Sequence, residues 1–123
     1  MKTILIDTNV LMSIAEFKMD IFAALQRDCD FPFRVAVLEG TLNELEKIRI
    51  EQRARYSRAA RLALDICKAK NIPIRTSVGD VDDLLVQYSR KDYLVLTQDV
   101  ALKKRLQRPY LTIRQKRKIV VVN

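Results

Sequence analysis

Short apolar runs alternate with longer segments of helical periodicity along the whole chain. The apolar runs are rich in β-branched residues and predict strands at residues 4–6, 34–38, 72–76, 93–97, 110–113 and 119–122. The segments with helical spacing lie between them, at 10–17, 20–25, 42–70, 81–89 and 100–106. Strands that alternate with helices favour parallel pairing with helices on both faces. We therefore expect one α/β domain over residues 1–123, a three-layer α/β/α sandwich around a mostly parallel sheet.

The helical segment at residues 42–70 has a predicted start, but the sequence leaves open whether it is one helix or two. Thr41 and Glu44 have the Thr-x-x-Glu spacing of a capping box, which predicts that a helix begins at Thr41. No Gly or Pro occurs between Leu42 and Lys70, so the sequence allows one long helix or two abutting helices. Ser57 is the best candidate for a break, as a second cap.

Composition removes several classes of chemistry. The chain contains no His, which excludes imidazole general bases, Ser-His and Cys-His pairs, and nearly all zinc sites. Its two cysteines, Cys29 and Cys67, are far apart and are expected to be reduced thiols. No run is long enough to cross a bilayer and no signal-peptide pattern is present, so we expect a cytoplasmic protein without a membrane partner. Any enzyme activity must then rest on carboxylates and a hard cation.

The positive charge is concentrated in the last part of the chain. The formal net charge is +8, from 23 Lys and Arg against 15 Asp and Glu. Residues 100–123 hold eight of the basic residues and no acidic one, so residues 1–99 balance at 15 of each sign. This basic segment alternates with core-like apolar residues, so we expect it to be folded. A basic face on a folded domain is typical of proteins that bind a polyanion such as nucleic acid.

Acidic residues follow the predicted strands at equivalent places. Asp7 ends the first strand, Glu44 and Asp82 lie near the starts of later helices, and Asp99 follows the fourth strand. The carboxyl ends of parallel strands share one edge of a sheet, where ligands bind. Carboxylates gathered there repel one another unless a cation neutralises them, and oxygen-only ligation suits Mg²⁺ or Mn²⁺. Each acid has a simpler alternative as a helix cap, with Thr8 and Asn9 as other candidate caps for the first helix.

Other acidic or nucleotide-binding folds fit the sequence less well. A haloacid-dehalogenase-type phosphatase needs Asp-x-Asp after its first strand, but the third residue here is Asn9. The acidic pair and the phospho-accepting Asp of a receiver domain are also missing. The chain has only two glycines and no glycine-rich phosphate loop.

These motifs resemble the PIN-domain (PilT N-terminal) ribonucleases. The resemblance rests on Ile-Asp-Thr-Asn at 6–9, Asn-Glu-Leu at 43–45, Val-Asp-Asp-Leu-Leu at 81–85 and Leu-Thr-Gln-Asp at 96–99. The stretch from Asp7 to Phe22 looks more like archaeal relatives of the rRNA-processing PIN nucleases than like VapC-type toxins. The resemblance implies a Mg²⁺- or Mn²⁺-dependent endoribonuclease whose catalytic metal ligands are Asp7, Glu44, Asp82 and Asp99. Asn9 and Thr97 would be supporting polar groups, and Asp83 is the alternative to Asp82.

The same resemblance implies RNA as the partner. In such a nuclease the cation activates a water and stabilises the leaving oxygen of the phosphodiester. Flanking phosphates would be held by basic residues, with little sequence preference, at Arg53, Arg55, Arg58, Lys103, Lys104 and Arg108. Three alternatives stay open: a VapC-type toxin with an antitoxin partner, a non-catalytic RNA-binding subunit, and a DNA nuclease. A homodimer is also compatible with the sequence.

Overall fold

A computed structural model describes all residues from 1 to 123 and shows strands and helices in the predicted order. The strands are β1 (Lys2–Ile6), β2 (Phe33–Leu38), β3 (Ile74–Arg75), β4 (Tyr93–Leu96), β5 (Tyr110–Arg114) and β6 (Lys118–Val122). The helices are α1 (Thr8–Phe17), α2 (Ile21–Asp28), α3 (Glu39–Glu51), α4 (Ala54–Ala69), α5 (Val81–Ser89) and α6 (Val100–Arg105). The expected α/β class and order of elements are confirmed.

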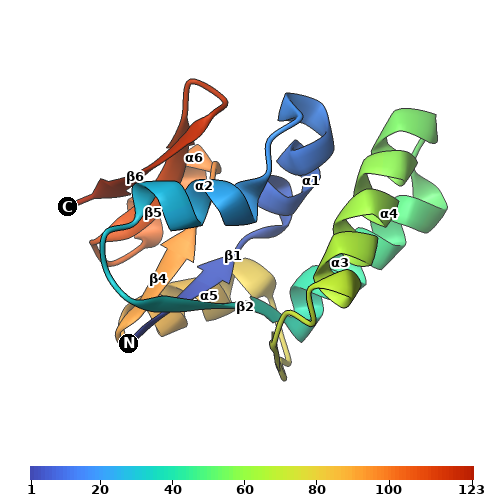
Figure 1. The fold of residues 1–123 in the computed structure, drawn as a ribbon. Coiled ribbons are helices and arrows are strands. Elements are labelled where there is room, and N and C mark those ends of the chain that lie inside the picture. The colour runs from blue at the N-terminus through green and yellow to red at the C-terminus, as the bar shows by residue number, and fades with distance from the viewer.

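The six strands form one sheet in the order β3-β2-β1-β4-β5-β6 (Figure 1). Every neighbouring pair is parallel except β5 and β6, which form an antiparallel hairpin at one edge. The first strand of the chain is therefore central, with Ile4 opposite Val35 on one side and Leu94 on the other. A central parallel strand is covered on both faces, which explains why residues 4–6 are all apolar.

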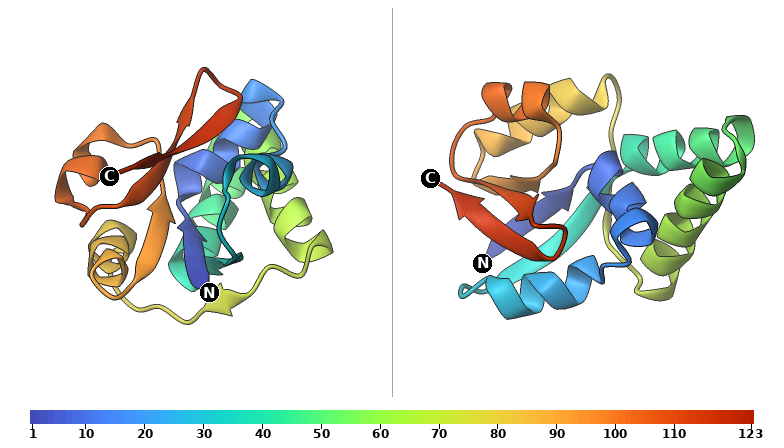
Figure 2. Two further views of the ribbon diagram at one scale, coloured as in Figure 1. Left: turned by 60° about the vertical axis from the view of Figure 1, so that its left-hand side comes forward. Right: turned by 90° about the horizontal axis from the view of Figure 1, so that it is seen from above.

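The two faces of the sheet bury separate hydrophobic clusters. Ile4 and Ile6 point into the larger cluster, beneath helices α1 to α4. Leu5 points the other way, into a smaller cluster with residues of α5 and α6. Figure 2 shows these two helical layers on opposite sides of the sheet. The alternation follows from the two-residue period of a strand, and it produces the expected three-layer sandwich.

The predicted capping box is wrong. Helix α3 begins at Glu39, directly after β2, with Leu38 at the N-cap position and no side-chain cap. A neighbouring loop compensates, because the backbone N–H of Gly40 donates to Ser77 Oγ at 2.8 Å. Thr41 lies inside the first turn of α3 and is fully buried. Tertiary contacts, not the local Thr-x-x-Glu pattern, therefore set the start of this helix.

The predicted break at Ser57 is also wrong, although two abutting helices do form. The break lies earlier, between Glu51 and Ala54. Ser57 lies in the first turn of α4 and its hydroxyl donates to the Arg49 carbonyl oxygen at 2.6 Å. This bond connects the end of α3 to the start of α4, which packs beside it (Figure 1). Ser57 thus supports the turn from inside the second helix.

Two further expectations concern the thiols and the membrane. Cys29 and Cys67 are both free, and burial raises the pKa of each thiol. None of the helices combines the length and the apolar character that crossing a membrane requires.

Candidate active site

The four candidate acids come from segments that leave the same edge of the sheet. Asp7 follows β1 and Asp99 follows β4, and these strands pair in parallel with Ile6 opposite Leu96. The backbone N–H of Asp7 continues that ladder by donating to the Leu96 carbonyl at 3.0 Å. Glu44 lies on α3, which leaves the neighbouring strand β2, and Asp82 lies in the first turn of α5.

Asp7 is buried, with only 5% of its surface exposed. It is the N-cap of α1 and accepts a hydrogen bond from the Thr8 N–H at 2.8 Å. Its other oxygen accepts a hydrogen bond from Thr97 Oγ1 at 2.7 Å. Burial raises the pKa of Asp7 and the charges of Asp82 and Asp99 raise it further, while the two hydrogen bonds oppose the rise. The side chain is thus fixed in one orientation next to other acids.

Glu44 and Asp82 are electrostatically connected to Asp7. Burial raises the pKa of Glu44, and the charges of Asp7 and Asp82 add to this effect. Burial also raises the pKa of Asp82, followed by the charges of Asp80 and Asp99. Like charges raise the pKa values of neighbouring carboxylates through space. The structure therefore brings all four candidate acids into one electrostatic cluster.

Thr97 and Asn9 connect the segments that carry the acids. The Thr97 hydroxyl donates to Asp7 and accepts from the Asp99 backbone N–H at 3.1 Å. Asn9 Oδ1 accepts a hydrogen bond from the Gln98 N–H at 3.3 Å. Asp99 itself is the N-cap of α6 and accepts from the Leu102 N–H at 2.9 Å. These bonds hold the β1–α1 and β4–α6 turns against each other.

The structure distinguishes Asp82 from Asp83. The Asp83 side chain is 58% exposed and forms an ion pair with Arg105 of α6. Asp82 is only partly exposed, and its pKa responds to Asp99 as well as to Arg105. Asp82 is therefore the member of this pair that belongs to the acidic cluster.

Two charged residues near the cluster were not predicted. Asp80 caps α5 by accepting a hydrogen bond from the Asp83 N–H at 2.9 Å. Its charge also raises the pKa of Asp82 and Glu44. Arg105 lies in a basic run, and nothing in the local sequence shows that it pairs with a residue 22 positions earlier.

The chemistry of the candidate side chains fits a hard cation. All candidate donors are oxygen atoms, which suits Mg²⁺ or Mn²⁺. The Thr8 hydroxyl is buried beside Glu44, where it lowers the pKa of this carboxyl, but it has no hydrogen-bond partner of normal geometry. No three acidic side chains lie close enough together to hold one ion, so binding an ion would require side chains of the cluster to rotate.

The six basic candidates fall into separate groups. Lys103 lies near Asp99. Burial and the charge of Arg114 lower the pKa of Lys103, and the charge of Asp99 raises it. Lys104 is exposed on the same helix, and Arg108 donates to the Asn123 carbonyl at 3.1 Å.

The other three basic candidates belong to α4 and its N-cap. Arg53 is the exposed N-cap residue of α4, and Arg55 and Arg58 line a cavity between α1 and α4. The acid that acts on the pKa of Arg55 is Glu16, not a member of the acidic cluster. Of the six basic candidates, Lys103 is the one that lies one helical turn from an acid of the cluster, Asp99.

Comparisons with known proteins agree with the fold. A family model described as a PIN-like domain matches residues 4–118. Among solved structures, the structure of the PIN domain endonuclease Utp24 superposes with a TM-score of 0.76 and is 28% identical. That alignment covers 97% of this chain and 90% of the other. A comparison with curated proteins finds no match. Because the family model spans nearly all of the sequence, this chain belongs to the PIN-like domain family.

Proposed function

We propose that this protein is a Mg²⁺- or Mn²⁺-dependent endoribonuclease whose metal ligands are Asp7, Glu44, Asp82 and Asp99. The observation that carries the proposal is the geometry at the sheet edge, where Asp7 and the Asp99 backbone N–H bond to the same Thr97 hydroxyl. The charges of Asp82 and Asp99 also raise the pKa of Asp7, and the charge of Asp7 raises that of Glu44. Utp24, a 28% identical structural neighbour, is described as a PIN domain endonuclease, which supports an endonuclease of the same fold.

The residues have distinct roles in this proposal. Thr97 and the Thr8 N–H fix Asp7, so this carboxylate would hold the cation in a constant position. Glu44 is at the surface and Asp82 and Asp99 are partly exposed, so these carboxylates are accessible to an ion. Asp99 can keep the Oδ1 that caps α6 and offer its other oxygen. A bound divalent cation would lower the pKa of a water and stabilise negative charge on the phosphate.

The substrate is proposed to be RNA. Lys103 lies next to Asp99, where its ammonium group can bind a phosphate beside the scissile bond. Lys104 adds a second exposed positive charge on the same helix. A role in rRNA or other RNA processing rests on the resemblance of the β1–α1 segment to archaeal relatives of the rRNA-processing PIN nucleases.

The deciding experiment compares Asp7→Asn with the wild-type protein on RNA in Mn²⁺, in Mg²⁺ and in EDTA. A circular RNA is the best substrate, because only an endonuclease can open it. Asp65→Asn is the matched control, since Asp65 is an exposed carboxylate on α4 that makes no hydrogen bond or ion pair. We expect cleavage by the wild type and by Asp65→Asn with either metal, and none by Asp7→Asn or in EDTA.

Two results would contradict the proposal in different ways. Equal cleavage by Asp7→Asn and the wild type would show that the acidic cluster is not the active site. RNA binding without any cleavage by the wild type would indicate a non-catalytic RNA-binding protein. DNA of the same sequence, tested in parallel, shows whether the enzyme distinguishes the two sugars.

A further inference from the structure

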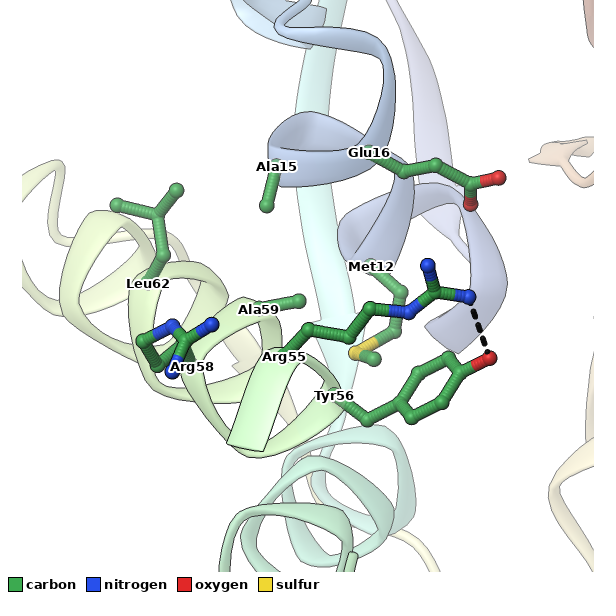
Figure 3. Close-up of a pocket in the computed structure, with 8 residues that line it drawn as sticks. All are labelled: Met12, Ala15, Glu16, Arg55, Tyr56, Arg58, Ala59 and Leu62. Carbon is green, nitrogen blue, oxygen red and sulfur yellow. Dashed lines mark hydrogen bonds between the residues drawn. The ribbon is translucent and has the colours of Figure 1, made fainter. Parts of the chain in front are cut away.

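A cavity of about 540 Å³ lies between α1 and α4, outside the acidic cluster (Figure 3). Its size is within the range of small-molecule pockets in proteins. Met12 and Leu62 contribute apolar surface, and Arg55, Arg58 and Glu16 contribute charge. A site that combines apolar surface with net positive charge suits a ligand with a flat apolar part and a negative part.

At this cavity the Arg55 guanidinium lies over the ring of Tyr56. The guanidinium carbon of Arg55 lies 4.9 Å from the centre of the Tyr56 ring. Arg55 Nη2 also donates to the Tyr56 hydroxyl at 2.9 Å, so the two planar groups are held together. Tyr56 nevertheless remains 46% exposed. Aromatic rings and arginine planes are the groups on which proteins stack unpaired RNA bases.

The cavity continues the side of α1 that begins at the acidic cluster. Thr8, beside Glu44, is followed at helical spacing by Met12 and Glu16, which line the cavity. At about 1.5 Å of rise per residue, Met12 lies roughly 6 Å and Glu16 roughly 12 Å along the helix from Thr8. An RNA strand bound at the acids can therefore reach the cavity without leaving this surface.

Arg58 and Glu16, which carry opposite charges, lie at different ends of the cavity (Figure 3). Arg58 lies beside Leu62, on the side away from Glu16 (Figure 3). A phosphate is attracted to Arg58 and repelled by Glu16. A base edge is suited to Glu16, because a carboxylate accepts hydrogen bonds from the N–H groups of bases. The two ends of the cavity thus match the two ends of one nucleotide.

We propose that this cavity binds one unpaired nucleotide of the RNA that flanks the cleaved phosphate. Its base stacks on the Tyr56–Arg55 pair with an N–H group toward Glu16, and its phosphate pairs with Arg58. The inference rests on the proposed nuclease function, and it adds a separate site that positions the substrate.

The test measures RNA binding and cleavage by Tyr56 variants. Binding of a short fluorescent single-stranded RNA is followed in an Asp7→Asn background, which prevents cleavage. Loss of base stacking in Tyr56→Ala should weaken binding about fivefold or more, and Tyr56→Phe should retain the affinity. Arg61→Ala is the control for charge on α4, because Arg61 is exposed and does not line the cavity. It should change the affinity much less than Tyr56→Ala does.

Two further readouts separate a substrate site from a structural role. In otherwise wild-type enzyme, Tyr56→Ala should raise KM and leave kcat at saturating RNA unchanged, because it removes binding made equally in ground and transition states. RNA that carries a photoreactive 4-thiouridine should cross-link to the peptide that contains Tyr56 or Met12.

The outcomes distinguish this inference from the proposed function. If the wild type neither binds nor cleaves RNA, the proposed function fails and this inference fails with it. If the wild type cleaves RNA but Tyr56→Ala binds and cleaves equally well, only this inference is overturned. It is also overturned if Tyr56→Ala changes the sedimentation of the protein from dimer to monomer at unchanged RNA affinity, because the cavity would then hold a second copy.

Discussion

Substitutions of Asp7 can separate the contribution of its carboxylate to stability from its proposed contribution to catalysis. Asp7→Asn retains an oxygen that accepts from the Thr8 N–H, and Asn caps a helix about as well as Asp. The amide also removes the cost of burying a charge at this position, where burial raises the carboxyl pKa. We therefore expect the free energy of unfolding of Asp7→Asn to lie within about 1 kcal/mol of the wild-type value.

Asp7→Ala should behave differently. It removes the cap, which costs about 0.5–2 kcal/mol, and it leaves the buried Thr97 hydroxyl without its acceptor, which costs about 1 kcal/mol more. The expected loss is therefore about 1.5–3 kcal/mol, which a domain with a typical stability of about 5–15 kcal/mol can sustain. Both variants should be folded and both inactive, since neither offers a carboxylate at this position.

The assay is urea unfolding followed by far-UV circular dichroism, together with RNA cleavage in Mn²⁺. Equal m-values would show that the variants differ in stability and not in the surface exposed on unfolding. Our reasoning is refuted if Asp7→Asn is destabilised as much as Asp7→Ala, because the negative charge itself would then hold α1 in place.

Three further predictions follow from single contacts. Asp82→Asn should reduce cleavage at least about a hundredfold, whereas Asp83→Asn, which breaks only an exposed ion pair, should retain most activity and change stability by less than about 1 kcal/mol. Thr97→Val should lower cleavage about 10- to 100-fold and raise the Mn²⁺ concentration needed for half-maximal activity, since the Asp7 carboxylate loses its donor. Hydrogen bonds from Arg27 lower the pKa of Asp28 to about 2, so the stability that this carboxylate provides should be lost as the pH falls from about 4 through 2. Urea midpoints at pH 7 and pH 2.5 should therefore differ less in Asp28→Asn than in the wild type, and an unchanged difference would exclude this linkage.

Local patterns in the sequence were sufficient to predict the class of fold and the sheet edge at which Asp7 and Asp99 lie. Residues 4–6 are apolar without alternation, so they predicted a strand covered on both faces, and β1 is the centre of the sheet. The alternation of strands and helices predicted parallel pairing, which brings Asp7 and Asp99 to one edge. These inferences succeeded because they depend on burial and on chain direction, both of which are recorded in local patterns.

Details that depend on residues distant in sequence could not be predicted from local patterns. Asp7 is buried and oriented by Thr97, 90 positions away, and Asp83 is paired by Arg105. Helix α3 starts at Glu39 because the preceding strand leads directly into it and a distant serine binds its first turn, so the local capping pattern was misleading. A sequence pattern indicates which polar groups need a hydrogen-bond or ion-pair partner. The partner itself often comes from a distant part of the chain, so it is known only once the fold is known. The cavity between α1 and α4 exists for the same reason, because it is formed by two helices that meet only after the chain has folded.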